Sequence, residues 1–215
     1  MIFNIITIFP QIFESYFNVA MIKRAQLKKI IQVKITDLRH YADNKYQSVD
    51  DTPYGGGAGM VLKIEPIYKA LKSIKRKKKS RVILFSARGK TLAQKDLQRL
   101  KKYDQLIMIC GRYEGVDNRV AEHLADEEIS IGNYVLTGGE IPAMILVDGI
   151  TRLLPGVLGN LESPKDESFT KEDELEYPQY TKPEKFKTWK VPEVLLSGHH
   201  GKIKEWREKQ KKRKP

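Results

Sequence analysis

The chain has 215 residues, of which 40% are hydrophobic, enough for one domain with a buried core and a small appendage. Its 39 Lys and Arg residues against 27 Asp and Glu residues give a net charge of +12, which favours a polyanionic partner, above all nucleic acid. A lysine-rich proteome would give the same excess. The single cysteine, Cys110, excludes an intrachain disulfide framework and a cysteine zinc site.

The N-terminal run, residues 1–9, predicts a short strand that ends at Pro10. It is apolar, it lacks basic residues at its start, and it is too short for a signal peptide or a transmembrane span. We therefore expect a cytoplasmic protein that does not enter a membrane.

Beyond Pro10 the chain alternates helical patterns with short apolar runs. Helices are expected over residues 12–25, 65–75, 92–100 and 116–124, and strands over residues 30–38, 81–86, 105–111 and 128–131. This alternation is typical of a buried parallel sheet. Residues 1–158 are therefore predicted to form one α/β domain.

The composition changes after this domain. Residues 159–178 are rich in Ser, Pro, Lys, Asp and Glu, and predict a flexible linker. Residues 179–215 predict a small, basic, helical C-terminal domain. A second basic run, Lys-Arg-Lys-Lys-Lys at residues 75–79, stands between an expected helix and an expected strand. Such runs are usually solvated faces, but two of them in a chain of this charge keep RNA binding open as well.

The densest local signal is Tyr-Gly-Gly-Gly-Ala-Gly-Met at residues 54–60, which holds four of the 15 glycines. Such a run costs too much entropy inside a helix or strand, so it predicts a loop that takes positive φ angles or approaches a ligand closely. A lone glycine loop is usually a tight turn. A second small-residue turn at residues 137–140 and further loops at strand ends favour a ligand or nucleic-acid site.

Three expected strands end in such loops, at residues 86–90, 110–115 and 131–140. Parallel α/β sheets bind ligands at the carboxyl ends of their strands, and backbone N–H and C=O groups there can hold a nucleoside. The Walker A and dinucleotide-binding patterns are absent, and no serine stands at a nucleophile elbow. His199 and His200 predict a surface turn, and we expect no metal site in the protein.

Five segments of the chain resemble the bacterial tRNA (guanine-N1)-methyltransferase family, of the knotted SPOUT superfamily. They run in family order over nearly the whole chain, at residues 49–60, 110–117, 130–144, 155–159 and 191–198. The resemblance implies an α/β fold with helices on both faces of the sheet, a C-terminal trefoil knot, and a homodimer whose active sites are shared between subunits. It also implies methylation of N1 of the guanosine immediately 3′ of the anticodon of tRNA, which helps to maintain the reading frame.

The resemblance implies S-adenosylmethionine as the methyl donor, and it leaves a dependence on Mg²⁺ open. The residues that it implies for donor binding are Ser86, Ala87, Gly89, Gly111, Glu114, Ile131, Gly132, Asn133, Tyr134, Val135, Leu136, Gly138 and Gly139. Those implied for tRNA binding are Asp50, Gly55, Gly56, Gly57, Ser168, Lys211, Lys212 and Arg213.

Methylation of guanine N1 needs a base, because this nitrogen carries a proton at neutral pH. The family shows an Asp directly before Ser-Phe, where this chain reads Lys-Asp-Glu-Ser-Phe at residues 165–169. An ungapped match places Glu167 at the catalytic position, and Asp166 takes that position if the loop shifts by one residue. The resemblance also implies that Arg152 stabilises negative charge on guanine O6. The sequence alone favours a different interpretation, in which Arg152 is an exposed charge at a helix C-terminus, and the resemblance reverses this preference.

Two features keep a second hypothesis open. The Asp-Glu order departs from the family, and the chain stops five residues after Gln210, where family members continue into more helix. An RNA-binding protein of the same fold without catalysis is therefore the alternative. A methyltransferase acting on ribosomal RNA is disfavoured, because relatives of that kind lack the Tyr-Gly-Gly-Gly segment.

Overall fold

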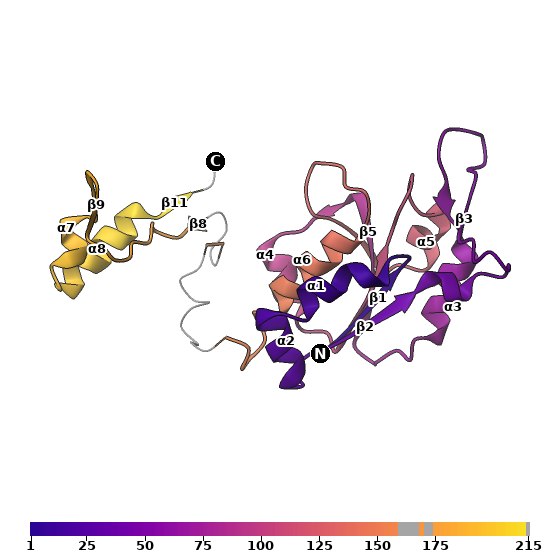
Figure 1. Cartoon of the computed structure of the whole chain (residues 1–215), viewed down its shortest axis with the longest axis horizontal. Coiled ribbons are helices and arrows are strands. Elements are labelled where there is room, and N and C mark those ends of the chain that lie inside the picture. The colour runs from indigo at the N-terminus through magenta and orange to yellow at the C-terminus, as the bar shows by residue number, and fades with distance from the viewer. Residues whose placement is uncertain (159–167, 170–173, 214–215) are drawn as a thin grey trace. The chain divides into compact units, whose positions relative to one another are not determined.

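The computed structural model describes residues 1–158, 168–169 and 174–213, and the chain divides into two compact units, Met1–Leu158 and Gly159–Pro215. Figure 1 shows the elements of both. The first unit contains, in chain order, β1 (Ile2–Thr7), η1 (Pro10–Phe13), α1 (Glu14–Phe17), α2 (Ala20–Leu27), β2 (Gln32–Asp37), η2 (Leu38–Tyr41), β3 (Asp50–Asp51), β4 (Val61–Leu62), α3 (Ile64–Ser73), β5 (Ser80–Thr91), α4 (Gln94–Leu100), β6 (Gln105–Cys110), α5 (Asn118–His123), β7 (Glu127–Ser130) and α6 (Glu140–Thr151).

A five-stranded parallel sheet forms the centre of this unit, in the order β2-β1-β6-β5-β7. Every residue of β6 is buried. The predicted α/β class with a mainly parallel sheet is confirmed. Parallel strands need cover on both faces, which explains why their apolar runs are nearly continuous in the sequence.

The two faces of the sheet belong to two separate hydrophobic cores. Along β6, Leu106 and Met108 enter one core, and Ile107 and Ile109 enter the other, as the alternation of a strand requires. The first core also holds buried residues of α2, α4 and α6, and the second holds those of α3 and α5. Figure 1 shows α4 and α6 on one side of β1 and β5, with α3 and α5 on the other.

The helix expected over residues 12–25 is interrupted. The structure divides it into η1, α1 and α2, and Ala20 takes a φ of +46° at the second break. Phe17 and Ile22 both enter the first core, but they stand five positions apart, so a continuous helix would turn them to different faces. Gln26 Nε2 donates to Phe17 O at 2.9 Å and satisfies a carbonyl left open by the break.

The second unit consists of short elements. They are β8 (Glu174–Leu175), β9 (Lys185–Phe186), β10 (Trp189–Lys190), α7 (Glu193–Leu196), α8 (His200–Gln210) and β11 (Lys212–Arg213). The C-terminal tail is not helical to its end, because β11 pairs antiparallel with β8. Residues 174–175, which the sequence placed in the linker, are thus held by a strand pairing.

Candidate active site

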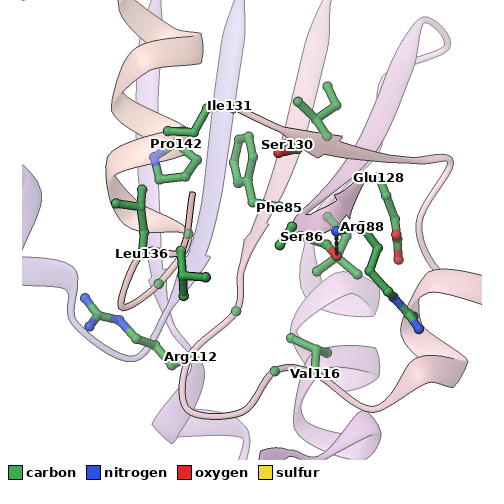
Figure 2. Close-up of a pocket in the computed structure, with 18 of the residues that line it drawn as sticks. Phe85, Ser86, Arg88, Arg112, Val116, Glu128, Ser130, Ile131, Leu136 and Pro142 are labelled. Carbon is green, nitrogen blue, oxygen red and sulfur yellow. Dashed lines mark hydrogen bonds between the residues drawn. The ribbon is translucent and has the colours of Figure 1, made fainter. Parts of the chain in front are cut away.

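A cavity of about 550 Å³ opens at the carboxyl ends of β5, β6 and β7, beside the start of α6. Figure 2 shows Leu136 and Pro142 on one side of it and Arg88 and Glu128 on the other. The residues predicted to bind the methyl donor line this cavity, with two exceptions, Gly89 and Asn133. Three loops that are far apart in the sequence therefore meet where the parallel topology predicts.

The first wall of the cavity comes from a bulge in β5. The strand does not end near Ser86 as expected, but continues to Thr91, and its pairing with β7 shifts so that Phe85 and Lys90 both lie opposite Ile129. Residues 86–89 leave the ladder between these two points, and Arg88 N donates to Ser86 Oγ at 3.1 Å.

Gly89 has a packing role in this bulge. A Cβ there would lie 2.6 Å from the backbone N of Ile129. Gly89 therefore allows β5 to pass close to β7 and does not face the cavity.

The second wall is formed by the end of β6 and the start of α6, whose backbones are in contact. Gly139 N donates to Gly111 O at 2.9 Å. A Cβ on Gly139 would lie 2.6 Å from Cys110 Cα, whereas a Cβ on Gly111 would lie 3.1 Å from a side-chain carbon of Val116 and 3.7 Å from Phe85 O. Gly139 is thus required by packing, and Gly111 leaves space in the cavity.

A buried carboxylate joins β1, the β6 loop and α6. Glu140 is 1% exposed; Thr7 Oγ1 donates to its Oε1 at 2.7 Å, and Arg112 Nε donates to its Oε2 at 2.9 Å. The Arg112 guanidinium lies over the Phe9 ring, 4.7 Å from its centroid. Burial, and then the charge of Glu140, raise the pKa of the neighbouring Cys110 thiol, so this cysteine stays protonated and unreactive.

The third wall is the loop between β7 and α6. Ser130 Oγ donates to Gly132 O at 3.0 Å, and Tyr134 OH donates to Ile131 O at 3.2 Å. Val135 is 90% exposed, so the tip of this loop presents an apolar side chain to solvent beside the cavity.

The glycine loop lies next to the second wall. Gly55, Gly56, Gly57 and Gly59 all take positive φ angles, between +79° and +123°, which confirms the predicted backbone conformation. Its base is fixed by two hydrogen bonds, from Glu114 N to Met60 O and from Leu62 N to Gly115 O, each 3.0 Å long. A Cβ on Gly55 or Gly56 would meet no atom within 4 Å, so the positive φ angles, and not close packing, favour glycine at these two positions. Asp50, in β3, pairs with Leu62 of β4 at the base of the same loop.

Arg152, one of the three residues expected to catalyse the reaction, does not line this cavity. Arg152 caps the C-terminus of α6, whereas Gly139 and Pro142, at the start of this helix, line the cavity. Twelve residues of helix separate the two ends by about 18 Å. Glu167 and Asp166 lie outside the described residues.

The other expected tRNA-binding residues belong to the second unit. Ser168 Oγ accepts a hydrogen bond from Glu176 N at 3.0 Å. Lys211 forms ion pairs with Glu208 at 2.9 Å and Glu174 at 3.4 Å, and the hydrogen bond to Glu208 is the main cause of its raised pKa. Lys212 and Arg213 form β11.

Several residues of the cavity were missed by the sequence analysis. Outside the predicted loops they are Phe85, Val116, Asn118, Glu128, Ser130 and Pro142, together with a few apolar neighbours, while Arg88, Arg112, Tyr113 and Thr137 lie inside those loops but were not named individually. Arg112, Tyr113 and Pro142 stand inside segments that carry the family resemblance, so their position was a signal. Glu128 is recognised only once the β5–β7 pairing is known.

Within the described parts of the chain, no group of three or more His, Cys, Asp or Glu side chains could hold a metal ion. The same residues include no helix with the length and apolarity needed to cross a membrane.

Comparison with known proteins places the chain in a family. The sequence model described as tRNA (Guanine-1)-methyltransferase TrmD matches residues 1–215. A tRNA (guanine-N(1)-)-methyltransferase of Dictyoglomus turgidum is 53% identical over 207 residues, which are 96% of this chain and 83% of the relative. The corresponding protein of Staphylococcus carnosus is 51% identical over 206 residues, 96% of this chain and 84% of its own. The crystal structure of tRNA (m1G37) methyltransferase from Aquifex aeolicus superposes with a TM-score of 0.80 at 42% identity, covering 96% of this chain and 87% of that one. The chain belongs to the tRNA (guanine-1)-methyltransferase family.

Proposed function

We propose that this protein transfers a methyl group from S-adenosylmethionine to N1 of the guanosine immediately 3′ of the tRNA anticodon, at position 37. The observation that carries the proposal is the cavity at the carboxyl edge of the sheet, because two of its three walls are built from segments that resemble the family, and the family model matches the whole chain. Relatives about half identical over nearly the whole chain carry the name of this activity.

The cavity fits the methyl donor by its size and lining. A volume of about 550 Å³ lies within the usual range for small-molecule sites. Apolar side chains of Val116, Leu136 and Pro142 suit the adenine ring, and the carboxylates of Glu114 and Glu128 suit ribose hydroxyls and a positive sulfonium. The donor supplies an electrophilic methyl group. The protein positions it through the glycine-rich backbone of the second wall.

The chemistry requires a base and a stabilising cation. We assign the base to Glu167, which would take the N1 proton while N1 attacks the methyl carbon, and Asp166 is the alternative if the loop shifts. We assign Arg152 to the negative charge that develops on guanine O6.

These roles favour a homodimer with shared active sites. Because about 18 Å of helix separates Arg152 from the cavity of its own chain, a catalytic Arg152 would act at the cavity of a partner subunit. The surface beside α6 supports this proposal, since Ile12 and Tyr16 of η1 and α1, and Ile141 and Ile145 of α6, are each 38–49% exposed. Tyr16 OH donates a hydrogen bond to Asp148 of α6, and this bond is the main cause that raises the pKa of Tyr16 to about 12. The same bond holds α1 against α6, so their exposed apolar side chains belong to one surface.

The partner of the protein and the location of the reaction are also proposals. The polyanionic partner is tRNA, in agreement with the net charge of +12, and the reaction takes place in the cytoplasm. The linker, the C-terminal tRNA-binding domain and the trefoil knot stay predictions from the family resemblance.

Methyl transfer to a defined tRNA tests the proposal. The protein is incubated with labelled S-adenosylmethionine and unmodified tRNA that carries G37, and the product is digested and analysed for 1-methylguanosine. A matched tRNA with A37 should receive no label. Addition of a chelator in the same assay tests for a Mg²⁺ requirement.

Tight binding of both tRNAs without methyl transfer would instead support the alternative of an RNA-binding protein that has lost catalysis.

A further inference from the structure

The edge of the sheet opposite the cavity carries a concentration of positive charge. All five strands are parallel, and the first residues of four of them lie side by side, with Gln32 beside Ile2, Ile2 beside Gln105, and Gln105 beside Ser80. The segments that enter these strands therefore share one edge. In Figure 1 the N-terminus and α2 mark this end of the unit.

Two of these segments bring basic residues together. Residues 75–79 enter β5 and residues 101–104 enter β6, and Asp104 N donates to Lys79 O at 2.9 Å, which places the two segments in contact. We name the surface that they form the basic edge. Its cations are Lys75, Arg76, Lys77, Lys78, Lys79, Lys101 and Lys102.

The basic edge is poorly neutralised. Arg76 lies 3.5 Å from Asp126, whereas the described residues place no carboxylate within ion-pairing distance of the six lysines. All the cations are exposed except Lys101, which is half-buried. Asp104 is the only acidic residue within residues 75–79 and 101–104. A surface of this composition attracts polyanions and repels other cations.

A buried side chain fixes the conformation of the basic run. Gln105 is 2% exposed; its Oε1 accepts from Lys77 N at 2.7 Å, and its Nε2 donates to Asn4 Oδ1 at 2.8 Å and to Lys75 O at 3.4 Å. The buried side-chain amide of Gln105 thus connects the interior of the sheet to the backbone of the basic run. These hydrogen bonds hold the backbone of the basic run in one conformation, from which its lysine side chains extend into solvent.

We propose that the basic edge binds the phosphodiester backbone of tRNA at a part of the molecule distant from the methylated nucleotide. The inference rests on the proposed function for the identity of the RNA. Strands of six residues separate the basic edge from the cavity by about 20 Å, so the two surfaces contact different parts of one folded tRNA. Lysine ammonium groups contact phosphates without reading bases, so this contact is independent of sequence.

Removal of three central charges tests the proposal. The variant Lys77→Gln/Lys78→Gln/Lys79→Gln is compared with a control of equal net charge, Lys23→Gln/Lys34→Gln/Lys95→Gln, whose lysines are exposed on α2, β2 and α4. Binding is measured as a function of salt for full-length tRNA, for a short anticodon stem-loop and for anionic phospholipid vesicles. Single-turnover methylation is measured for both RNAs.

The basic-edge variant should bind full-length tRNA about tenfold more weakly at physiological salt, and its salt dependence, the slope of log K against log salt, should flatten by about two to three. Its binding and methylation of the stem-loop should match wild type, as should every property of the control variant.

Three results would overturn the proposal. One is a tRNA salt slope equal to that of the control, and another is an equal loss of affinity for tRNA and stem-loop. The third is a loss confined to anionic phospholipid vesicles, which would make the basic edge a membrane-contact surface. Failure of the wild type to methylate either RNA would count against the proposed function, while the binding curves would still judge the basic edge.

Discussion

Glu140 shows how a single buried carboxylate holds the candidate active site together. It accepts hydrogen bonds from Thr7, which is 133 positions away, and from Arg112, which is 28 positions away. The sequence shows only an acid after two glycines, so neither partner could be predicted from it. The same limit applies to Gly89, which was expected at the donor and instead packs against β7.

We predict that Glu140→Gln destabilises the protein and weakens donor binding. A neutral amide cannot accept from both Thr7 and the Arg112 guanidinium with the same strength, and breaking a buried ion pair on one side costs about 3 kcal/mol. Urea unfolding should show a loss of this order, and calorimetry should show weaker S-adenosylmethionine binding. The control Glu14→Gln alters an exposed carboxylate of α1 and should leave both quantities within about 0.5 kcal/mol of wild type.

Glu127 predicts a specific dependence of stability on pH. Burial raises the pKa of this carboxyl, but hydrogen bonds from Arg99 and Arg81 outweigh that effect, so its net pKa lies below the ordinary 4.5. A lowered folded-state pKa contributes stability above pH 4.5 that is lost as the pH falls through the folded-state value. Compared with wild type, Glu127→Gln should be less stable at pH 7, and its unfolding free energy should decline less between about pH 5 and pH 3. Parallel curves for the two proteins in urea titrations would contradict this assignment.

The identity of the base is a further prediction at this scale. Glu167→Gln should slow single-turnover methyl transfer by about a hundredfold to ten-thousandfold with tRNA binding nearly intact, because it removes the proton acceptor. Arg152→Ala should be equally damaging, and Asp166→Asn should have a much smaller effect. If Asp166→Asn is the crippled variant, the ungapped register is wrong by one residue.

At the scale of elements, the expected strands are present, but their ends were predicted less well. Short apolar runs indicated β1, β2, β6 and β7, because a parallel strand covered on both faces leaves a nearly continuous apolar run in the sequence. The extension of β5 to Thr91 depends on its pairing with β7, and the interruption before α2 depends on which side chains reach the core. The N-terminus of α6 was not predicted, because its apolar residues surround the helix without a clear face.

The two glycines of the second wall should respond differently to substitution. Gly111→Leu places a side chain toward Val116 and the cavity, so it should abolish donor binding in calorimetry with a small change in stability. Gly139→Ala forces a Cβ against the backbone of β6, so it should lower the unfolding free energy by about 1–3 kcal/mol. Retention of donor affinity in Gly111→Leu would show that the donor does not occupy this cavity.

At the scale of the whole molecule, the sequence predicted the position of the ligand site, but not the distance between that site and Arg152 within one chain. The carboxyl edge of a parallel sheet follows from topology, and the cavity lies there. The position of Arg152 at the far end of α6 is visible only in three dimensions, and it turns the expected dimer into a requirement of the proposed mechanism.

Subunit complementation tests this requirement. In a shared site, Arg152 of one subunit serves the cavity of the other, so Arg152→Ala and Gly111→Leu disable different halves of each site. Each homodimer should be inactive. When equal amounts of the two variants are unfolded together and refolded, half of the dimers should contain one subunit of each variant. Each mixed dimer should contain one intact site, so the mixture should show about a quarter of the wild-type rate. Sedimentation should show dimers throughout. Activity that stays at zero in the mixture would mean that Arg152 and the cavity serve the same subunit. An active Arg152→Ala homodimer would instead mean that Arg152 has only the role of a helix-terminal charge.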